Sequence, residues 1–312
     1  MNKRLIFAGG TDWSVKLLKT LIKKGFNVVG ILAPPDSKKD RDQKKTPHML
    51  KEKATQLNIP VYQPGKLSDP KFLREFNQLK PDLVVVVAYG KLFPKDMLTI
   101  PPLGFINFHP SLLPKLRGPS PIISAILEGL EETGVSIMKL GEGIDDGPIL
   151  SQKSVKIRPR ETTETLTRKL VDLGKEIIPV ILKKYFKDEV NLKFQPKTGF
   201  TVCKMIKKKD GCINWRNETA REIDRKIRAL NSQFKTFTFI ERDKQKKRVN
   251  ILESTGVLAT KLLPGEYKLI GKNLAIGTKN KALLISKIQL EGKKLITAKE
   301  FYYGYKERCF VL

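Results

Sequence analysis

Histidine and cysteine are scarce in this sequence, with two and three residues respectively among 312. The cysteines Cys203, Cys212 and Cys309 form no Cys-x-x-Cys pair and are odd in number, which favours reduced, structural thiols over a disulfide framework. The histidines His48 and His109 lie far apart in the chain, so no zinc-type ligand set can be assembled from sequence. We therefore expect no metal, and any imidazole chemistry has two candidate residues.

Long apolar runs are also missing. No segment approaches the roughly 20 apolar residues that a membrane span requires. The first apolar segment, residues 5–8, is cut short by Gly9-Gly10 and is typical of a first strand rather than a signal peptide. We expect a protein that does not bind membranes and is located in the cytoplasm.

Acidic residues are few compared with basic ones: 32 Asp and Glu stand against 60 Lys and Arg, a net charge of +28. Exposed lysines can simply be solvated, but an excess of this size favours a polyanionic partner, because binding to phosphates releases their counterions. More than half of the excess lies in residues 204–312, which hold 26 basic and 11 acidic residues. This distribution predicts a nucleic-acid-binding module in the last third of the chain.

In the first 188 residues, short continuous apolar runs alternate with segments whose apolar residues recur at helical spacing. The continuous runs predict buried strands over residues 3–8, 27–32, 82–88 and 105–109. The alternation predicts an α/β domain with a doubly wound, mostly parallel, Rossmann-like sheet. The Gly9-Gly10 turn lacks the Gly-x-Gly-x-x-Gly spacing of dinucleotide sites. Helices are expected over residues 118–130 and 162–186.

The pattern changes after residue 188. Short alternating segments broken by glycines predict a small β-barrel or sandwich near the C-terminus. We expect a first domain over residues 1–188, a linker over 189–208 and a second domain over 209–312.

A polar insertion over residues 34–48 follows the second predicted strand and is longer than such connections usually are. It is either a solvated surface loop or a basic loop that becomes ordered on a phosphate backbone, and the net charge favours the second. A second basic cluster occurs at residues 204–209. The candidate RNA-contacting residues in these two segments are Lys38, Lys39, Arg41, Lys44, Lys45, Lys204, Lys207 and Lys208.

Asn107 and His109 are two residues apart at the end of a predicted strand, so both side chains would project from the same face. An imidazole can act as acid or base near neutral pH, and a carboxamide can donate to a developing oxyanion. The alternative is structural: Asn107 caps a turn and His109 is a satisfied, semi-buried histidine. An isolated Asn-x-His pair is more often of this second kind.

A carboxylate can complete this pair. The glycine-rich turn over residues 141–147 contains Asp145 and Asp146, either of which could point inward, orient the imidazole and favour its protonated form. Ser111 lies in a proline-bounded turn rather than in a strained nucleophile elbow, so a covalent mechanism lacks its nucleophile. The loop that begins at Tyr89-Gly90 lies at the carboxyl end of another strand, where open α/β sheets bind ligands.

A resemblance to the folate-dependent formyltransferases is carried by Asn107-Phe108-His109-Pro110-Ser111-Leu112-Leu113-Pro114, by Arg117-Gly118 and by the Gly143-Ile144-Asp145-Asp146-Gly147 loop. It implies 10-formyltetrahydrofolate as formyl donor. It also implies a catalytic triplet of Asn107, His109 and Asp145. The folate-contacting residues that we expect are Tyr89, Gly90, Ser111, Leu112, Leu113 and Pro114.

The basic insertion and the second domain resemble those of the family members that formylate methionine on initiator tRNA. This resemblance implies initiator methionyl-tRNA as partner, a role in translation initiation and an OB-like C-terminal barrel that grips the tRNA. Such an enzyme needs no partner subunit, so a monomer is expected.

Four other functions share part of this evidence. A sugar-nucleotide or glycinamide ribonucleotide formyltransferase, or a formyltetrahydrofolate hydrolase, would contain the first domain but not the basic second one. A non-catalytic RNA-binding protein would explain the charge but not the triplet of Asn107, His109 and Asp145.

Overall fold

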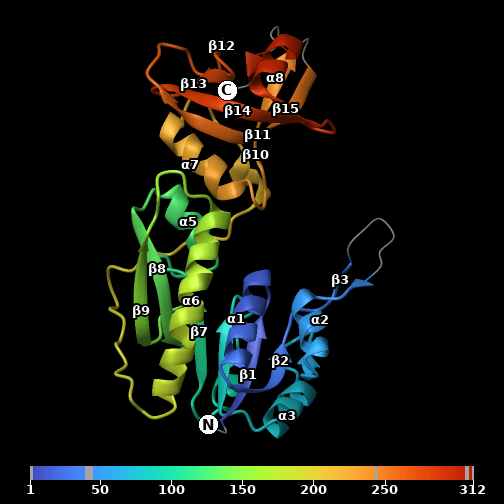
Figure 1. Cartoon of the computed structure of the whole chain (residues 1–312), viewed down its shortest axis with the longest axis vertical. Helices are drawn as coiled ribbons and strands as arrows, with labels where there is room; N and C mark the ends of the chain where they lie inside the picture. Colours follow the sequence, from blue (N-terminus) through green and yellow to red (C-terminus); the bar gives the residue numbers. More distant parts are fainter. Residues whose placement is uncertain (1–2, 39–44, 243–244, 306–308, 311–312) are drawn as a thin grey trace. The chain divides into compact units, whose positions relative to one another are not determined.

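The computed structural model of the chain describes residues 3–38, 45–242, 245–305 and 309–310 (Figure 1). Two compact units are present. The first consists of residues 1–121, 132–156 and 167–203, and the second of residues 122–131, 157–166 and 204–312. Residues 189–203, expected to belong to a linker, are therefore grouped with the first unit, and the domain boundaries stay a prediction.

Seven strands form the sheet of the first unit, in the order β5-β2-β1-β6-β7-β8-β9. The five strands from β5 to β7 are parallel, while β8 and β9 run antiparallel. The predicted doubly wound, mostly parallel sheet is confirmed. The strands are β1 (Arg4–Gly9), β2 (Asn27–Leu32), β5 (Val61–Tyr62), β6 (Leu83–Val87), β7 (Phe105–His109), β8 (Glu132–Lys139) and β9 (Ile149–Lys156).

The strand order reverses between β1 and β6, because the chain adds β2 and β5 on one side of β1 before it returns to the other side. Ligands of doubly wound sheets bind outside the carboxyl ends of the strands near such a reversal. All five residues of β6 are buried, as expected for a central parallel strand covered on both faces.

Helices α1 (Asp12–Lys23), α2 (Met49–Gln56), α3 (Pro70–Gln78), α4 (Lys95–Leu98) and most of α6 (Thr163–Tyr185) belong to the first unit. Local sequence explains where they begin: the Thr11 hydroxyl caps α1, the His48 imidazole caps α2 and the Asp69 carboxylate caps α3. The β7 residue Phe108 packs against α1, with its ring 5.5 Å from that of Trp13. A Cβ on Gly174 of α6 would overlap the same ring, so Phe108 fills the face of β7 opposite to Asn107 and His109.

The insertion after β2 begins and ends in two short paired strands, β3 (Ser37–Lys38) and β4 (Lys45–Thr46). Asp36 fixes the base of this hairpin by accepting hydrogen bonds from the backbone N–H of His48, from Lys51 Nζ and from Gln63 Nε2. The predicted RNA-contacting residues Lys39, Arg41 and Lys44 lie outside the described residues.

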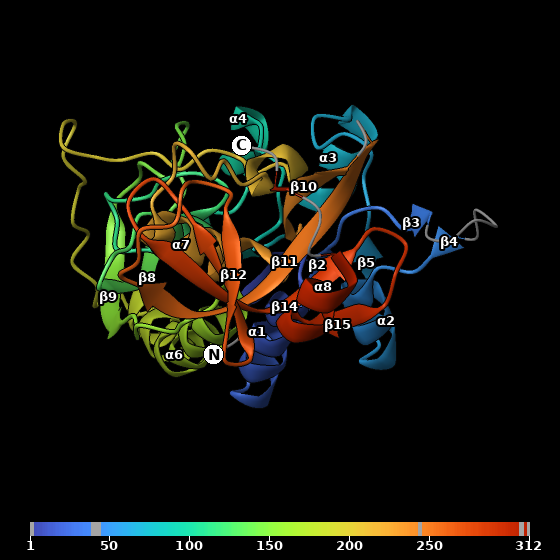
Figure 2. The ribbon, with the colours of Figure 1, turned by 90° about the horizontal axis from the view of Figure 1, so that it is seen from above.

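The second unit is built on an antiparallel, barrel-like sheet in the order β12-β13-β14-β11-β10-β16, with β15 paired to β14. Its strands are β10 (Thr236–Arg242), β11 (Gln245–Leu258), β12 (Tyr267–Ile270), β13 (Asn273–Gly277), β14 (Ala282–Leu290), β15 (Leu295–Thr297) and β16 (Cys309–Phe310). Helices α7 (Ala220–Leu230) and α8 (Ala298–Tyr305) both pack against β14 (Figure 2). The unit also contains most of α5 (Pro121–Leu127) and a 3-10 turn, η1 (Lys208–Gly211). A small C-terminal domain of the predicted β class is therefore present.

Trp215 anchors the core of the second unit. Its side chain is fully buried, and its indole N–H donates to the Thr238 hydroxyl over 2.9 Å. Around it lie apolar side chains of α7, α8 and the sheet, so the unit has a core of its own. Among the described residues, no helix is both long and apolar enough to cross a membrane.

Candidate active site

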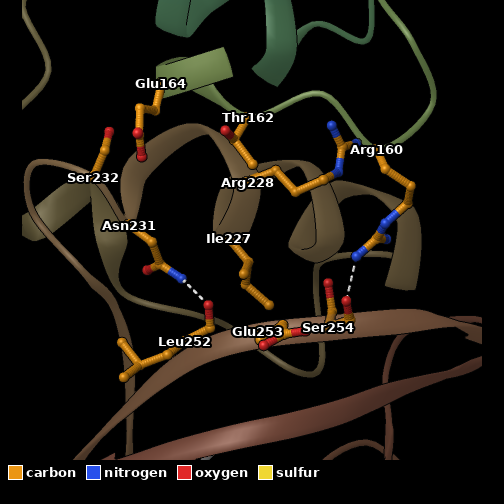
Figure 3. A pocket seen from close by; sticks show the side chains of 10 residues that line it. All are labelled: Arg160, Thr162, Glu164, Ile227, Arg228, Asn231, Ser232, Leu252, Glu253 and Ser254. Carbon is orange, nitrogen blue, oxygen red and sulfur yellow. Dashed lines mark hydrogen bonds between the residues drawn. The ribbon is translucent and has the colours of Figure 1, made fainter. Parts of the chain in front are cut away.

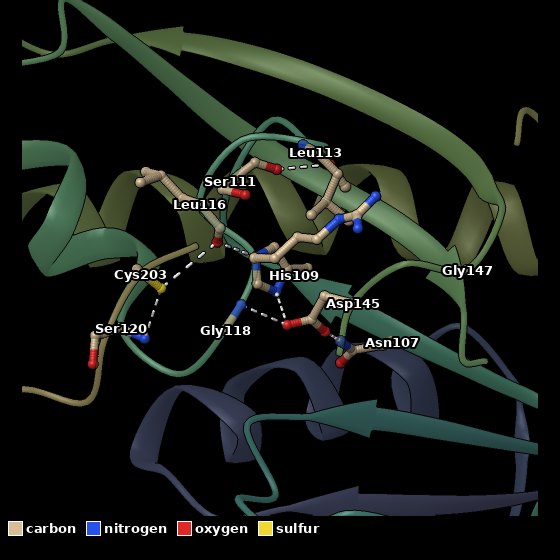
Figure 4. A network of polar contacts seen from close by, with 12 residues as sticks. Asn107, His109, Ser111, Leu113, Leu116, Gly118, Ser120, Asp145, Gly147 and Cys203 are labelled. Carbon is tan, nitrogen blue, oxygen red and sulfur yellow. Dashed lines mark hydrogen bonds and ion pairs between the residues drawn. The ribbon is translucent and has the colours of Figure 1, made fainter. Parts of the chain in front are cut away.

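The Asn107–His109 pair lies at the carboxyl end of β7, with both side chains directed to one face of the sheet (Figure 4). The strand covers Phe105–His109, as the sequence predicted. Asn107 is half-buried, while His109 is only 3% exposed. The pair is next to the end of β6, where the sheet topology favours a ligand site.

Asp145 joins these two side chains through its two carboxylate oxygens. Its Oδ1 accepts a hydrogen bond of 3.2 Å from Asn107 Nδ2, and its Oδ2 lies 3.5 Å from His109 Nδ1. The Gly118 backbone N–H donates to the same Oδ2 over 2.9 Å. The end of β7 and the Gly118 turn thus converge on the carboxylate of a third segment.

Asp146 does not take part in this cluster. Its side chain is exposed and lies against Gly141 and Gly143 of its own loop, which have no room for a Cβ on that side. Asp145 has a left-handed backbone with a φ of 48°, which Asp tolerates better than most residues. This backbone conformation separates the directions of the two adjacent carboxylates, so Asp145 is the one that points inward.

The hydrogen bonds of His109 fix which of its nitrogens carries a proton. Nε2 lies 3.0 Å from the Leu116 carbonyl oxygen, which can only accept, so Nε2 must donate. Nδ1 is then the nitrogen that gains or loses a proton, and it faces Asp145. Burial lowers the pKa of His109, while the Asp145 carboxylate and the Leu116 carbonyl act in the opposite direction.

The Leu116 carbonyl is aimed at His109 by an unusual backbone conformation. Leu116 has a φ of 57°, uncommon for a branched side chain, and it is buried. The Thr201 hydroxyl accepts from its N–H over 2.8 Å, and the Cys203 thiol donates weakly to its carbonyl. Backbone strain at such a site persists only where neighbouring contacts hold it, and here the 201–203 segment provides them.

The turn over residues 111–114 is locked to β8 and β9. The Ser111 hydroxyl donates to the Lys115 carbonyl over 2.6 Å, and Ser136 Oγ both donates to the Ser111 carbonyl and accepts from the Leu113 N–H. Ser111 is fully buried and Leu113 packs in the core, so Leu112 and Pro114, each half-buried, are the accessible parts of the turn. Because the Ser111 hydroxyl is engaged in closing the turn, its geometry is that of a structural group and not of a nucleophile.

Tyr89 brings an unusual polar atom to the end of β6. The ring is buried and stacks on Phe93 with 5.5 Å between centroids, but its hydroxyl has no hydrogen-bond partner among the described residues. Burial raises the pKa of Tyr89 to about 12, so the hydroxyl is a neutral donor near pH 7. An unsatisfied buried hydroxyl is costly, and a polar ligand would satisfy it. Gly90 follows as an exposed residue with a φ of 79°.

The predicted basic contacts occur in two places. Lys38 and Lys45 are register partners across the β3–β4 pair. Lys204, Lys207 and Lys208 are exposed at the start of the second unit, where Lys204 lies 3.6 Å from an Asp210 oxygen. Nothing in these contacts assigns the lysines a ligand, so RNA binding stays a prediction.

Arg117 and Gln195 are the site residues that sequence reasoning missed. Arg117 is not a surface charge, because it is only 8% exposed. Its Nε and Nη2 donate to Gln195 Oε1 over 3.1 and 2.8 Å, and its guanidinium lies 4.6 Å from the Phe200 ring centroid. The only signal for Arg117 was its place in the resemblance, and for Gln195 the sequence offered none.

A cavity of about 440 Å³ within the second unit has no comparable chemistry (Figure 3). Arg160 and Arg228 line it, but their guanidinium groups each donate over 2.8 Å to the Asp224 carboxylate. The Asn231 amide donates to the Leu252 carbonyl. Because these polar groups are satisfied by the protein, the cavity is not a second candidate active site.

The described part of the chain contains no group of three or more His, Cys, Asp or Glu side chains placed to hold a metal ion.

Comparison with known proteins gives the family. The family described as formyl transferase matches residues 2–182, and the family described as formyl transferase, C-terminal domain, matches residues 205–306. A methionyl-tRNA formyltransferase from Thermodesulfovibrio yellowstonii is 39% identical over 307 residues, which is 98% of this chain and 97% of that protein. One from Buchnera aphidicola is 38% identical over 97% of this chain and 96% of its own length.

Solved structures share the fold. An N-formyltransferase from Helicobacter canadensis, in complex with folinic acid and dTDP-3-aminofucose, superposes with a TM-score of 0.67 at 20% identity, covering 91% of this chain and 98% of that one. The phosphoribosylglycinamide formyltransferase of Bacillus halodurans covers only 62% of this chain, at 27% identity and a TM-score of 0.52, with all of its own length covered. The chain belongs to the formyl transferase family and, within it, to the methionyl-tRNA formyltransferases.

Proposed function

We propose that the chain transfers a formyl group from 10-formyltetrahydrofolate to the α-amino group of methionine on initiator methionyl-tRNA. The observation that carries this proposal is the Asp145 carboxylate, which joins the Asn107 amide and the His109 imidazole at the carboxyl end of β7. This is an acid–base site without a nucleophile, in a chain similar over nearly its whole length to methionyl-tRNA formyltransferases. Direct transfer between two bound substrates suits such a site.

The donor would lie across the ends of β6 and β7. The Tyr89 hydroxyl, unsatisfied among the described residues, offers a hydrogen bond to a polar heterocycle. Gly90 leaves space beside it, because a Cβ placed there would have no described atom within 4 Å apart from those of its chain neighbours. On the other side, the accessible parts of Leu112 and Pro114 supply apolar contact. These residues fit a folate-type ring, polar along its edge and apolar on its face.

The first chemical step is attack of the methionine amine on the formyl carbon. A carbon–nitrogen bond forms, and the electron pair of the carbonyl moves onto oxygen. Asn107 donates one amide N–H to Asp145 and has a second that can donate to this oxyanion. A proton on His109 Nδ1, stabilised by Asp145, adds positive charge at the same place.

The second step breaks the bond between the carbon and the folate nitrogen. His109 gives its Nδ1 proton to the departing nitrogen, directly or through water, and takes one from the attacking nitrogen. The electron pair on oxygen reforms the carbonyl. The products are the formylated amine and tetrahydrofolate, and His109 ends in its starting protonation state.

The excess of basic residues near the C-terminus supports the choice of tRNA as acceptor. Residues 204–312 hold 26 basic and 11 acidic residues, and this segment contains the whole match to the C-terminal formyl transferase domain. A sugar-nucleotide or glycinamide ribonucleotide acceptor would not require this charge. Contacts between basic side chains and tRNA phosphates would make tRNA binding weaken steeply as the salt concentration rises.

The test is an acceptor comparison. The purified chain is supplied with 10-formyltetrahydrofolate and, in turn, with charged initiator methionyl-tRNA, glycinamide ribonucleotide and an amino-sugar nucleotide. We expect formylmethionyl-tRNA as the main product, with a KM for tRNA that rises with salt. Preferential formylation of either small acceptor would overturn the proposed substrate, and the absence of any formyl product would overturn the reaction.

A further inference from the structure

Gln195 uses every hydrogen-bonding group of its side chain to connect two parts of the active site. Its Nε2 donates to the backbone carbonyls of Asp145 and Gly147, over 2.9 and 2.8 Å. Its Oε1 accepts from Nε and Nη2 of Arg117. A side chain satisfied in this way has no donor or acceptor left for a ligand, so its contribution is to the position of other groups.

These contacts close a ring of interactions around the catalytic carboxylate. Gln195 holds the backbone of the aspartate loop on one side and Arg117 on the other. The next residue after Arg117 is Gly118, whose N–H donates to the Asp145 carboxylate over 2.9 Å. Figure 4 shows Asp145 and Gly147 on one loop with Gly118 opposite. Asp145 is therefore restrained twice: Gln195 holds its backbone carbonyl, and the Arg117–Gly118 turn holds its carboxylate.

We propose that Gln195 is a positioning residue that holds the Asp145 carboxylate at its distance from the His109 imidazole. The inference rests on the proposed function for its catalytic consequence, and on geometry alone for its structural one. Asp145 has a left-handed backbone, and its carbonyl is one of the two that receive the Gln195 amide hydrogens. Without these donors the loop loses a restraint at the residue whose direction matters most.

The consequence for His109 follows from the groups that surround it. Nδ1 faces the Asp145 carboxylate, and Nε2 faces the Leu116 carbonyl, which also accepts from the Cys203 thiol. Gln195 also engages the Arg117 guanidinium, through two of its donor atoms. A carboxylate that moves away from Nδ1 stabilises the imidazolium form less. Loss of Gln195 should therefore lower the pH at which His109 titrates.

The variants are Gln195→Met, which keeps the length of the side chain without its hydrogen bonds, and Gln195→Asn, which keeps the amide but is too short to make all four contacts. Gln289 of β14 gives a matched control, because its amide also donates to a backbone carbonyl, that of Lys293, and accepts from a cation, Lys235. Gln289→Met removes equivalent hydrogen bonds from the second unit.

The first measurement is the NMR titration of the imidazole signals, which needs no substrate. With two histidines in the chain, His109 is identified by its absence in His109→Ala. We expect its midpoint to fall by about one pH unit in Gln195→Met, by less in Gln195→Asn, and not at all in Gln289→Met. An unchanged His109 midpoint in a folded Gln195 variant would overturn the proposal. Should the methionine variant fail to fold, the asparagine variant decides.

The second measurement is kcat for tRNA formylation as a function of pH. We expect kcat to fall by 10- to 100-fold in Gln195→Met with the KM for tRNA within about twofold, and the alkaline limb of the profile to move to lower pH. A shifted imidazole midpoint without formylation by the unmodified chain would keep the positioning role and overturn the proposed function. A shifted midpoint with unchanged kcat would show that the position of Asp145 does not limit transfer, which contradicts the catalytic part of the inference.

Discussion

The adjacent residues Asp145 and Asp146 provide a direct test of the charge at the active site. Replacing either by asparagine removes one negative charge from the same loop with little change in shape. Only Asp145 is near the imidazole, with Oδ2 3.5 Å from His109 Nδ1, whereas Asp146 is exposed. Asp145→Asn should therefore impair transfer, and Asp146→Asn is its matched control.

The distance between the two groups sets the size of the effect. Unit charges 3.5 Å apart attract by about 1 kcal/mol in bulk water and by about 5 kcal/mol at the effective dielectric constant of a site near a protein surface. The Asp145 side chain is 15% exposed, so the second figure is an upper bound. Since about 1.4 kcal/mol is a factor of ten in rate, we expect kcat to fall by about two orders of magnitude in Asp145→Asn.

The assay is single-turnover formylation of methionyl-tRNA across a range of pH. In Asp145→Asn the imidazolium loses its counterion, so the pKa of His109 should fall and the alkaline limb of the profile should move to lower pH. In Asp146→Asn both rate and profile should match the unmodified chain. Equal losses in the two variants, or a near-normal rate in Asp145→Asn, would refute the assignment of the inward carboxylate.

Three further outcomes are expected. Tyr89→Phe removes a buried hydroxyl that has no partner in the described part of the chain, so the free energy of unfolding should be unchanged or rise by about 1 kcal/mol. The KM for the folate donor should rise about three- to tenfold, and an unchanged KM would remove Tyr89 from the donor site. Hydrogen bonds from Lys51 and Gln63 and from the His48 backbone lower the pKa of Asp36 to about 2, below its ordinary 3.8, so its contribution to stability is complete above pH 4 and is lost as pH falls through 2. Denaturant unfolding between pH 2 and 5 should show this loss in the unmodified chain and not in Asp36→Asn, and parallel curves would contradict it. Charge reversal in the insertion should raise the KM for tRNA and leave donor binding unchanged, whereas an unchanged KM would make the insertion a solvated loop; the residues to reverse are Lys38, Lys39, Lys44 and Lys45.

The chemistry of β7 was predictable because it depends on local rules. An apolar run with a glycine before it and a proline after it marks a strand over residues 105–109, and the two-residue period puts Asn107 and His109 on one face. Phe108 faces the opposite way into packing, as the same period requires. That the Asp145 carboxylate reaches this pair depends on the φ of one residue, which the sequence did not determine.

The start of α5 shows where local rules fail. The prolines at 119 and 121 predicted a helix from residue 118, but it begins at Pro121. The reason is tertiary: the Gly118 N–H donates to the Asp145 carboxylate, and the Ser120 N–H donates to the Cys203 sulfur. These donors serve the site and its supporting segment, so the helix begins three residues later than predicted.

Gln195 and Thr201 were unpredictable for a similar reason. Both lie in a segment without helical or strand periodicity, and sequence patterns gave it only the role of a linker. Their importance comes from pairing with residues far away in sequence, since Gln195 contacts Asp145 and Arg117, and Thr201 contacts Leu116. A single sequence does not reveal such long-range pairings, so these two residues looked like any other polar side chains in a loop.

The central claim is that His109 performs proton transfer in a formyl transfer to tRNA. The most direct test is the single-turnover formylation rate of His109→Ala at saturating methionyl-tRNA and 10-formyltetrahydrofolate, with tRNA affinity measured in parallel. We expect the rate to fall by at least two orders of magnitude while the Kd for tRNA stays within about threefold, since a 3% exposed imidazole presents almost no surface to a large ligand. A formylation rate close to that of the unmodified chain would contradict the account.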